Sequence, residues 1–180
     1  DRLVGNTTYC NVPEAAQKKE KVGSVIQMNV EKILRLKPDL VIASALSREK
    51  QLKILQKMSI KVMRAKNPVT FEQMCGMTVD LGRTLGCFER AQKIVSDAEQ
   101  KANSILERTA MLDKPKVFLQ IGIKPLHSAN KEMFINEYIR YGGGINIAED
   151  EGTGVYSREK VLAENPDIIL IATMGSSKKA

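Results

Sequence analysis

The sequence predicts an α/β protein with two α/β lobes, each built on a mainly parallel sheet, joined by one long α-helix. Short apolar runs alternate with amphipathic stretches along the chain, which is typical of parallel strands covered by helices. A helix–turn–strand unit occurs twice, and a long helical pattern lies between the two copies. Two similar lobes joined in this way form a cleft, where we expect a ligand to bind.

The composition is that of an ordinary globular protein, with 180 residues of which 43% are hydrophobic and 27% charged. No apolar stretch approaches the ~20 residues that a membrane-spanning helix needs. Three cysteines are too few for a disulfide scaffold, and a single histidine with unclustered cysteines does not make the usual zinc site. We therefore expect no resident metal site.

The net charge of +7 raises the possibility of nucleic-acid binding. However, Lys and Arg are spread along the chain among acidic residues, and the sequence contains no Trp. Four Tyr and four Phe are not interleaved with basic residues as they are in an RNA-binding sheet. The pattern favours a solvated basic surface over a nucleic-acid site, and such a surface also helps to collect an anionic ligand.

The expected elements follow from hydrophobic periodicity and from turn-forming residues. Strands are predicted at residues 3–5, 40–43, 60–63, 117–121 and 168–171. Helices are predicted at residues 30–37, 48–57, 131–141 and 158–164. The glycines at 142–144 follow a helix and lack the Lys-Ser/Thr of a phosphate loop, so we interpret them as a helix cap.

A longer helical pattern runs from Thr70 to about Met111, and Gly86 is expected to break it. The part from Glu89 to Ala110 is free of Gly and Pro, so it predicts a rod of about 33 Å. We therefore expect three parts: an N-terminal α/β lobe at residues 1–88, a linking helix at 89–113 and a C-terminal α/β lobe at 114–180. We also expect Cys75 and Cys87 to be free, buried thiols and Cys10 to be unpaired.

The internal repeat is the most informative feature of the sequence. Residues 31–42 return as residues 159–170, with Glu, Lys, Leu, Pro and Asp matching in register. Each copy predicts a short helix, a Pro-Asp turn that stops it and a buried strand. A chance likeness between helix–turn–strand units is the alternative, but the matches in register favour a duplicated architecture.

These segments resemble those of the class III periplasmic substrate-binding proteins, which serve ABC importers of cobalamin, haem and ferric siderophores. The family's Asn-x-Glu, helix and Lys-Pro-Asp-Leu-Val strand are similar to residues 29–42. Its Phe-Leu-Gln strand, Lys-Glu loop and Gly-Gly-x-Asn are similar to residues 117–146, and its second Glu motif to residues 157–159. The likeness covers nearly the whole chain and is strongest to the cobalamin-binding branch.

The resemblance implies a two-lobed, monomeric binding protein outside the cytoplasm, either periplasmic or lipid-anchored at the cell surface. Such a protein captures a metal chelate (haem, cobalamin or a ferric siderophore) and delivers it to the permease subunits and ATPase of an importer. It has no catalytic residues, cofactor or nucleic-acid partner, and it touches the membrane only through the permease or a lipid anchor. The family has further strands and helices before Asp1 and after Thr173, so we expect an incomplete C-terminal lobe with an unpaired edge strand.

Glu31 and Glu159 occupy equivalent positions in the two copies of the repeat, each in the first turn of a helix. Favourable interaction with the helix dipole, worth ~0.3–1 kcal/mol, is one explanation for each acid. The resemblance implies another, because matching glutamates of the family dock into arginine pockets on the two permease subunits. A pair of acids related by pseudo-symmetry suits such a two-fold partner.

The ligand is expected at the carboxyl ends of the parallel strands, where their loops begin. This rule selects the following ligand-binding candidates: Tyr9, Met28, Ser44, Lys66, His127 and Tyr156. Tyr, Met and His carry atoms that can bind haem iron, and the family's counterpart of Tyr9 lines the ligand. Two tryptophan positions of the cobalamin binder fall near Val25 and Thr153, which are not aromatic here.

Two other function classes remain open at this point. An enzyme on paired α/β lobes, with an interdomain metal or small-molecule site, is the first, but no Ser-His-Asp order or nucleotide loop is present. A basic nucleic-acid adaptor is the second, and it predicts an affinity that falls steeply with salt.

Overall fold

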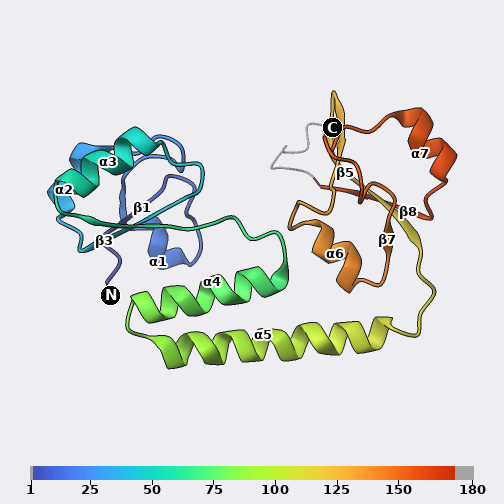
Figure 1. The fold of residues 1–180 in the computed structure, drawn as a ribbon, viewed down its shortest axis with the longest axis horizontal. Helices are drawn as coiled ribbons and strands as arrows, with labels where there is room; N and C mark the ends of the chain where they lie inside the picture. The colour runs from blue at the N-terminus through green and yellow to red at the C-terminus, as the bar shows by residue number, and fades with distance from the viewer. Residues whose placement is uncertain (1, 173–180) are drawn as a thin grey trace. The chain divides into compact units, whose positions relative to one another are not determined.

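The computed structural model describes residues 2–172, and the chain divides into two compact units, Asp1–Asn67 and Pro68–Ala180. Each unit combines helices with a small sheet that contains parallel strands (Figure 1). The predicted α/β class is confirmed. The predicted end of the C-terminal lobe, from residue 173 onward, lies outside the described residues.

The first unit holds two pairs of parallel strands. Its elements are β1 (Gly5–Asn6), α1 (Glu14–Gln17), β2 (Glu20–Lys21), α2 (Val30–Leu36), β3 (Leu40–Ala43), α3 (Glu49–Lys57) and β4 (Lys61–Arg64). Strand β1 pairs with β2, and β3 pairs with β4 in a register that runs from Leu40 opposite Lys61 to Ala43 opposite Arg64. Helix α3 connects β3 to β4 and buries Leu52 and Leu55, because these two side chains share one face of the helix.

The second unit is built around one long strand. Its elements are α4 (Phe71–Thr84), α5 (Phe88–Thr109), β5 (Lys116–Ile123), β6 (Leu126–Ser128), α6 (Asn136–Tyr141), β7 (Ile145–Asn146), α7 (Arg158–Glu164) and β8 (Ile168–Ile171). Strand β5 pairs with β6 in an antiparallel hairpin and with β7 and β8 in parallel. It is the central strand because it alone contacts all three others.

Alternate residues of β5 point to opposite faces of its sheet and form two core clusters. Val117 and Leu119 pack with Ala129 and Ile139 on one face. Phe118 packs with Ala148 and Tyr156 on the other, with the Phe118 and Tyr156 rings 5.3 Å apart between centroids. Both faces of β5 are therefore covered, as expected for a strand in a parallel α/β sheet.

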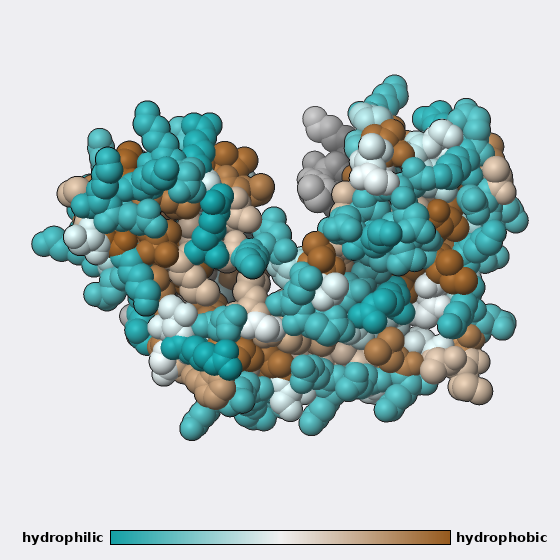
Figure 2. All heavy atoms as spheres, in the orientation of Figure 1, coloured by the Kyte–Doolittle hydropathy of each residue, from teal (hydrophilic) through white to brown (hydrophobic). Residues whose placement is uncertain are grey.

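In the part of the chain that the structure describes, few other residues pack against the side chains of strand β8. Among the described residues it pairs with β5 alone, and all four of its side chains are exposed, with Ile171 the most exposed at 66%. Within residues 2–172, β8 is therefore an edge strand of this sheet. Exposed hydrophobic side chains, among them Val25 and Ile26, also occur in the first unit. Figure 2 shows hydrophobic side chains interspersed with hydrophilic ones on the surface of both units.

The break in the long helical pattern is confirmed at Gly86, whose φ of +67° lies in the left-handed region. Helix α4 ends before it, and α5 begins just after it and packs against α4. The two helices approach closely at Gly82, where an added Cβ atom would lie 2.3 Å from the Cβ of Ala91. Because α4 packs along α5, the compact second unit begins at residue 68, which differs from the predicted boundaries at 88 and 113.

The repeat is reproduced in the structure residue by residue. Helices α2 and α7 have the same bounds after the shift of 128 residues, and so have strands β3 and β8. Both helices end at a left-handed residue, Lys37 with φ 47° and Asn165 with φ 47°. The duplicated architecture inferred from the sequence is therefore confirmed for these two segments.

Several local predictions were wrong. The first strand begins at Gly5 instead of Leu3, and residues 131–135 form turns instead of the start of a helix. Cys87 is exposed, although it was expected to be buried, because it precedes the first residue of α5 on the surface; Cys75 is buried, and all three cysteines are free. The cap interpretation of residues 142–144 fits, since Gly143 has a φ of +79° just after α6.

Candidate functional site

The two candidate docking glutamates have closely similar local structures. Glu31 and Glu159 are each the second residue of a helix, and both are exposed. The N-cap residue differs between the two copies, but in both its side chain accepts a hydrogen bond from a backbone N–H in the first turn of the helix. The side-chain oxygen of Asn29 accepts a bond of 2.9 Å from the backbone N–H of Lys32, and the Ser157 hydroxyl accepts one of 3.0 Å from that of Lys160. Each cap fixes its helix start, and with it the position of the glutamate.

The electrostatic surroundings of Glu159 favour its ionised form. A hydrogen bond from its own backbone N–H, followed by one from the Ser157 hydroxyl, holds the pKa of this carboxyl below its usual value. The nearby Arg158 guanidinium acts in the same direction. Glu159 therefore carries a negative charge at neutral pH, as a docking role requires.

Glu31 lies at an open, polar hollow of the first unit. The hollow is lined by Thr8, Gly23, Ser24, Gln27, Met28, Asn29, Val30, Glu31 and Gln51. The Gln51 side chain holds the backbone of Met28 by donating to its carbonyl at 2.8 Å and accepting from its N–H at 3.4 Å. One predicted ligand residue and one predicted docking residue thus share a single surface.

The other predicted residues of the first unit lie on loops that follow strands. Tyr9 follows β1 and is 80% exposed. Ser44 directly follows β3, and Lys66 lies two residues after the end of β4. Because β3 and β4 are parallel and the Ala65 N–H donates to the Ala43 carbonyl at 2.8 Å, Ser44 and Lys66 follow strands that end at the same sheet edge.

His127 lies on a strand and not in the predicted loop. It belongs to β6, opposite Gly122 of β5, and bridges to Val155 on its other side. The hairpin forms because the chain turns at residues 124–125 and pairs back on β5. His127 is half-buried there.

Tyr156 is in the core and not at a ligand surface. Its side chain is 4% exposed, and its hydroxyl donates to the Ile147 carbonyl at 3.1 Å. Burial raises the pKa of this phenol. The Tyr156 ring packs on Phe118 and its hydroxyl is already bonded, so these contacts do not favour a direct role in ligand binding.

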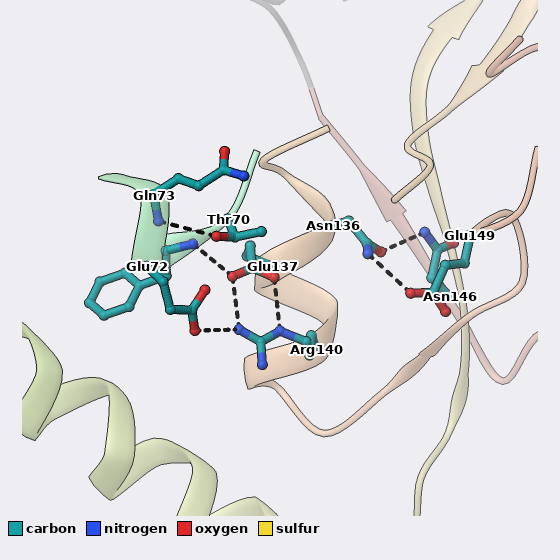
Figure 3. A network of polar contacts seen from close by, with 9 residues as sticks. Thr70, Glu72, Gln73, Asn136, Glu137, Arg140, Asn146 and Glu149 are labelled. Carbon is teal, nitrogen blue, oxygen red and sulfur yellow. Dashed lines mark hydrogen bonds and ion pairs between the residues drawn. The ribbon is translucent and has the colours of Figure 1, made fainter. Parts of the chain in front are cut away.

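A polar network that the sequence did not single out organises the loops of the second unit (Figure 3). The buried Asn146 amide donates to the Ala129 carbonyl and to the Asn136 side-chain oxygen, both at 2.8 Å. Its own side-chain oxygen accepts from the Ala148 N–H at 3.0 Å. The Gly-Gly-x-Asn pattern includes Asn146, but two of its partners, Ala129 and Asn136, lie 17 and 10 residues away and could not be identified from the sequence.

A second network holds the start of α4 on α6 (Figure 3). The Glu137 carboxylate accepts from the Phe71 N–H at 2.9 Å and from two nitrogens of Arg140 at 2.8 and 2.9 Å. Arg140 also reaches Glu72 at 3.5 Å. The three-residue spacing of Glu137 and Arg140 was visible in the sequence, whereas the bond to Phe71 was not.

Within residues 2–172, no group of three or more His, Cys, Asp or Glu side chains is placed to hold a metal ion. In the same part of the chain, no helix is both long enough and apolar enough to cross a membrane. His127 therefore belongs to no such group of metal-binding side chains in this part of the chain.

Comparison with known proteins identifies the family. The periplasmic binding protein family model matches residues 1–180. The chain belongs to this family. The class III resemblance seen in the sequence is thereby confirmed, and the two-lobed α/β class with it.

The curated relatives include vitamin B12-binding proteins. That of Salmonella typhi is 34% identical over 172 residues, which cover 94% of this chain and 64% of the relative. That of Yersinia pseudotuberculosis is 30% identical over 175 residues, covering 96% of this chain and 62% of the relative. The chain thus spans somewhat less than two thirds of the length of these periplasmic binding proteins.

Solved structures agree in fold. A periplasmic haem-binding protein from Pseudomonas aeruginosa matches with a TM-score of 0.84 and 26% identity, covering 98% of this chain and 66% of the other. The periplasmic vitamin B12-binding protein of Vibrio cholerae matches with a TM-score of 0.76 and 26% identity, covering 94% of this chain and 68% of the other. The likeness to a haem-binding protein of Vibrio cholerae, at 20% identity and a TM-score of 0.87, shows the fold alone.

Proposed function

We propose that this periplasmic binding protein is the extracytoplasmic substrate-binding component of an ABC importer. The observation that carries the proposal is the duplicated unit, which exposes one glutamate at the same place in each copy, in a chain of this family. A symmetric pair of acids suits a receptor made of two equivalent subunits. The protein is then a carrier, without catalysis and without a cofactor, and works as a monomer.

The proposed substrate is a metal chelate: cobalamin, haem or a ferric siderophore. Curated relatives are named for vitamin B12 binding, and similar solved structures for haem or iron binding. Tyr9, Met28, Ser44, Lys66 and His127 remain the proposed ligand contacts, since each is at least partly exposed. Tyr156 drops out of the proposal because it is buried and its hydroxyl is bonded.

The proposed partner is the membrane permease with its ATPase, contacted by Glu31 and Glu159. Both carboxylates are exposed at helix starts that a side-chain cap holds in place. The proposed location is outside the cytoplasm, either periplasmic or anchored to the membrane by lipid. Membrane contact then occurs only through that anchor or through the permease.

The substrate is tested by thermal unfolding of the purified protein with haemin, cyanocobalamin or ferrichrome. A bound chelate stabilises the folded state by mass action, so at 100 times Kd it adds ~2.7 kcal/mol. Haemin binding also changes the Soret absorption of the mixture. Tyr9→Ala and His127→Ala should weaken the chelate that stabilises the wild type, with Tyr138→Ala as an exposed tyrosine control. Absence of any shift with all three chelates contradicts the proposed substrate class.

A further inference from the structure

Each docking glutamate is followed directly by a lysine that the structure ties back onto its own unit. Lys32 follows Glu31, and its ammonium lies 2.6 Å from a carboxylate oxygen of Glu20. Lys160 follows Glu159, and its ammonium pairs with a carboxylate oxygen of Glu151. Glu20 and Glu151 lie before the two repeated segments and at different distances from them, so the duplication alone does not explain these two acids.

Each lysine also has a second contact of its own. The Lys32 ammonium donates to the Lys21 carbonyl at 3.3 Å. The Lys160 ammonium lies 4.9 Å from the centre of the Tyr156 ring, within the range of a cation–π contact. The contacts differ between the two copies, but in each copy they hold the lysine ammonium on its own unit.

The glutamates themselves are not engaged in ion pairs within residues 2–172, although Glu159 accepts hydrogen bonds from its own backbone N–H and from the Ser157 hydroxyl. Among the described residues, the ion pairs include neither Glu31 nor Glu159, whereas Glu20 and Glu151 are both engaged. A free ammonium one residue from a docking carboxylate would compete with the cation of a partner. It would also reduce the local negative potential that brings oppositely charged surfaces together.

We propose that Glu20 and Glu151 are positioning residues for docking, which act by holding Lys32 and Lys160 away from the docking glutamates. This inference rests on the proposed function, because it needs a partner that offers a cation, such as an arginine guanidinium, to each glutamate. Glu20 and Glu151 do not contact the partner in this arrangement. Their effect reaches it through the lysine.

The test uses Glu20→Gln and Glu151→Gln, with binding to the co-expressed permease–ATPase complex in nanodiscs measured by biolayer interferometry. Each change removes the acid that pairs with one lysine and so loosens its ammonium, and we expect the association rate to fall by about two- to fivefold, the size of an exposed ion-pair effect. Adding Lys32→Gln to Glu20→Gln, or Lys160→Gln to Glu151→Gln, removes the freed cation and should restore the wild-type rate. A purely structural role of either acid predicts no such rescue.

Glu49→Gln is the matched control. Like Glu20 and Glu151, Glu49 pairs with a cation, Arg64 at 3.1 Å, so the change in net charge and the loss of one ion pair are the same. It should leave the association rate unchanged. An equal loss in Glu49→Gln, or no rescue by the lysine substitutions, overturns the inference.

Failure of the proposed function looks different. If Glu31→Lys/Glu159→Lys binds the permease as the wild type does, or if the wild type does not bind at all, docking through the glutamates is wrong and the positioning role falls with it. A different outcome is that the wild type binds the permease, Glu31→Lys/Glu159→Lys does not, and both Glu20→Gln and Glu151→Gln bind at the wild-type rate. In that case only the positioning role is wrong.

Discussion

Glu137 offers the sharpest test of how the second unit is held together. Its side chain is only 10% exposed, and three donors point at its carboxylate, from Phe71 and from two nitrogens of Arg140. Glu137→Gln keeps the shape but removes the charge, and its amide cannot accept at both oxygen positions. One of the donors then loses its acceptor.

The expected loss follows from these contacts. Hydrogen bonds to a charged group contribute about 1.5–3 kcal/mol each, and breaking a fully buried ion pair costs about 3–5 kcal/mol. The Arg140 side chain is 46% exposed, so water replaces part of what is lost and the lower figures apply. We expect Glu137→Gln to reduce the free energy of unfolding by about 2–3 kcal/mol at pH 7, measured by urea denaturation.

The pH dependence gives an independent check. The bonds from Arg140, together with that from the Phe71 N–H, hold the pKa of Glu137 below its usual value. A group whose pKa is lower in the folded state contributes its full stability above the unfolded pKa and loses it as the pH falls through the folded pKa. The difference between the wild type and Glu137→Gln should therefore be constant above about pH 5.5 and shrink below pH 4.5.

Glu132→Gln is the control for this experiment, since Glu132 is exposed on the neighbouring turn and no ion pair of the described residues includes it. It should change the free energy of unfolding by no more than about 0.5 kcal/mol. A loss below 0.5 kcal/mol in Glu137→Gln, or a loss that stays constant down to pH 3, would refute the reasoning.

Three further predictions follow from other contacts. Asn146→Ala removes three bonds of a buried amide and should lower the free energy of unfolding by about 2–4 kcal/mol in urea denaturation, with normal stability contradicting the network. Gly82→Ala should lower the free energy of unfolding by about 1–3 kcal/mol, because the added methyl group overpacks α4 against α5. Gly76→Ala, on the same helix with open space around it, should be neutral or stabilising by up to about 1 kcal/mol. Equal melting temperatures of the two variants would contradict this. Reversing both proposed docking charges, in Glu31→Lys/Glu159→Lys, should abolish uptake while chelate affinity and melting temperature stay near those of the wild type. Normal uptake with a lower melting temperature supports the helix-dipole role instead.

The elements that the sequence predicted well are those whose signals are local. Helices α2 and α7 have an N-cap residue, an amphipathic run and a Pro-Asp stop within a dozen residues, so their ends could be found without tertiary information. Gly86 marked the break between α4 and α5 for the same reason. The family resemblance rested on these same segments, and the comparisons confirm it.

The elements that were missed depend on partners elsewhere in the chain. Strands β2 and β7 have two residues each, too few for any periodicity, and exist because a neighbouring strand pairs with them. The rule that ligands lie at carboxyl ends of strands selected the loop that contains Tyr156 but could not tell which of its side chains point inward. Phe118 and the Ile147 carbonyl decide that orientation, and both are remote in sequence.

The two copies of the repeat agree in backbone and cap but not in every side chain, and the difference bears on docking. Val30 begins α2, whereas Arg158 begins α7 and places a cation beside Glu159. A two-fold partner that met identical surfaces would select the same residue in both places. Under the proposed docking, Glu31 stands without an arginine at the first helical position and should therefore offer the stronger attraction to a partner cation. Both lysines that follow the glutamates are nevertheless paired with an acid of their own unit, as the proposed positioning role requires even where an arginine remains.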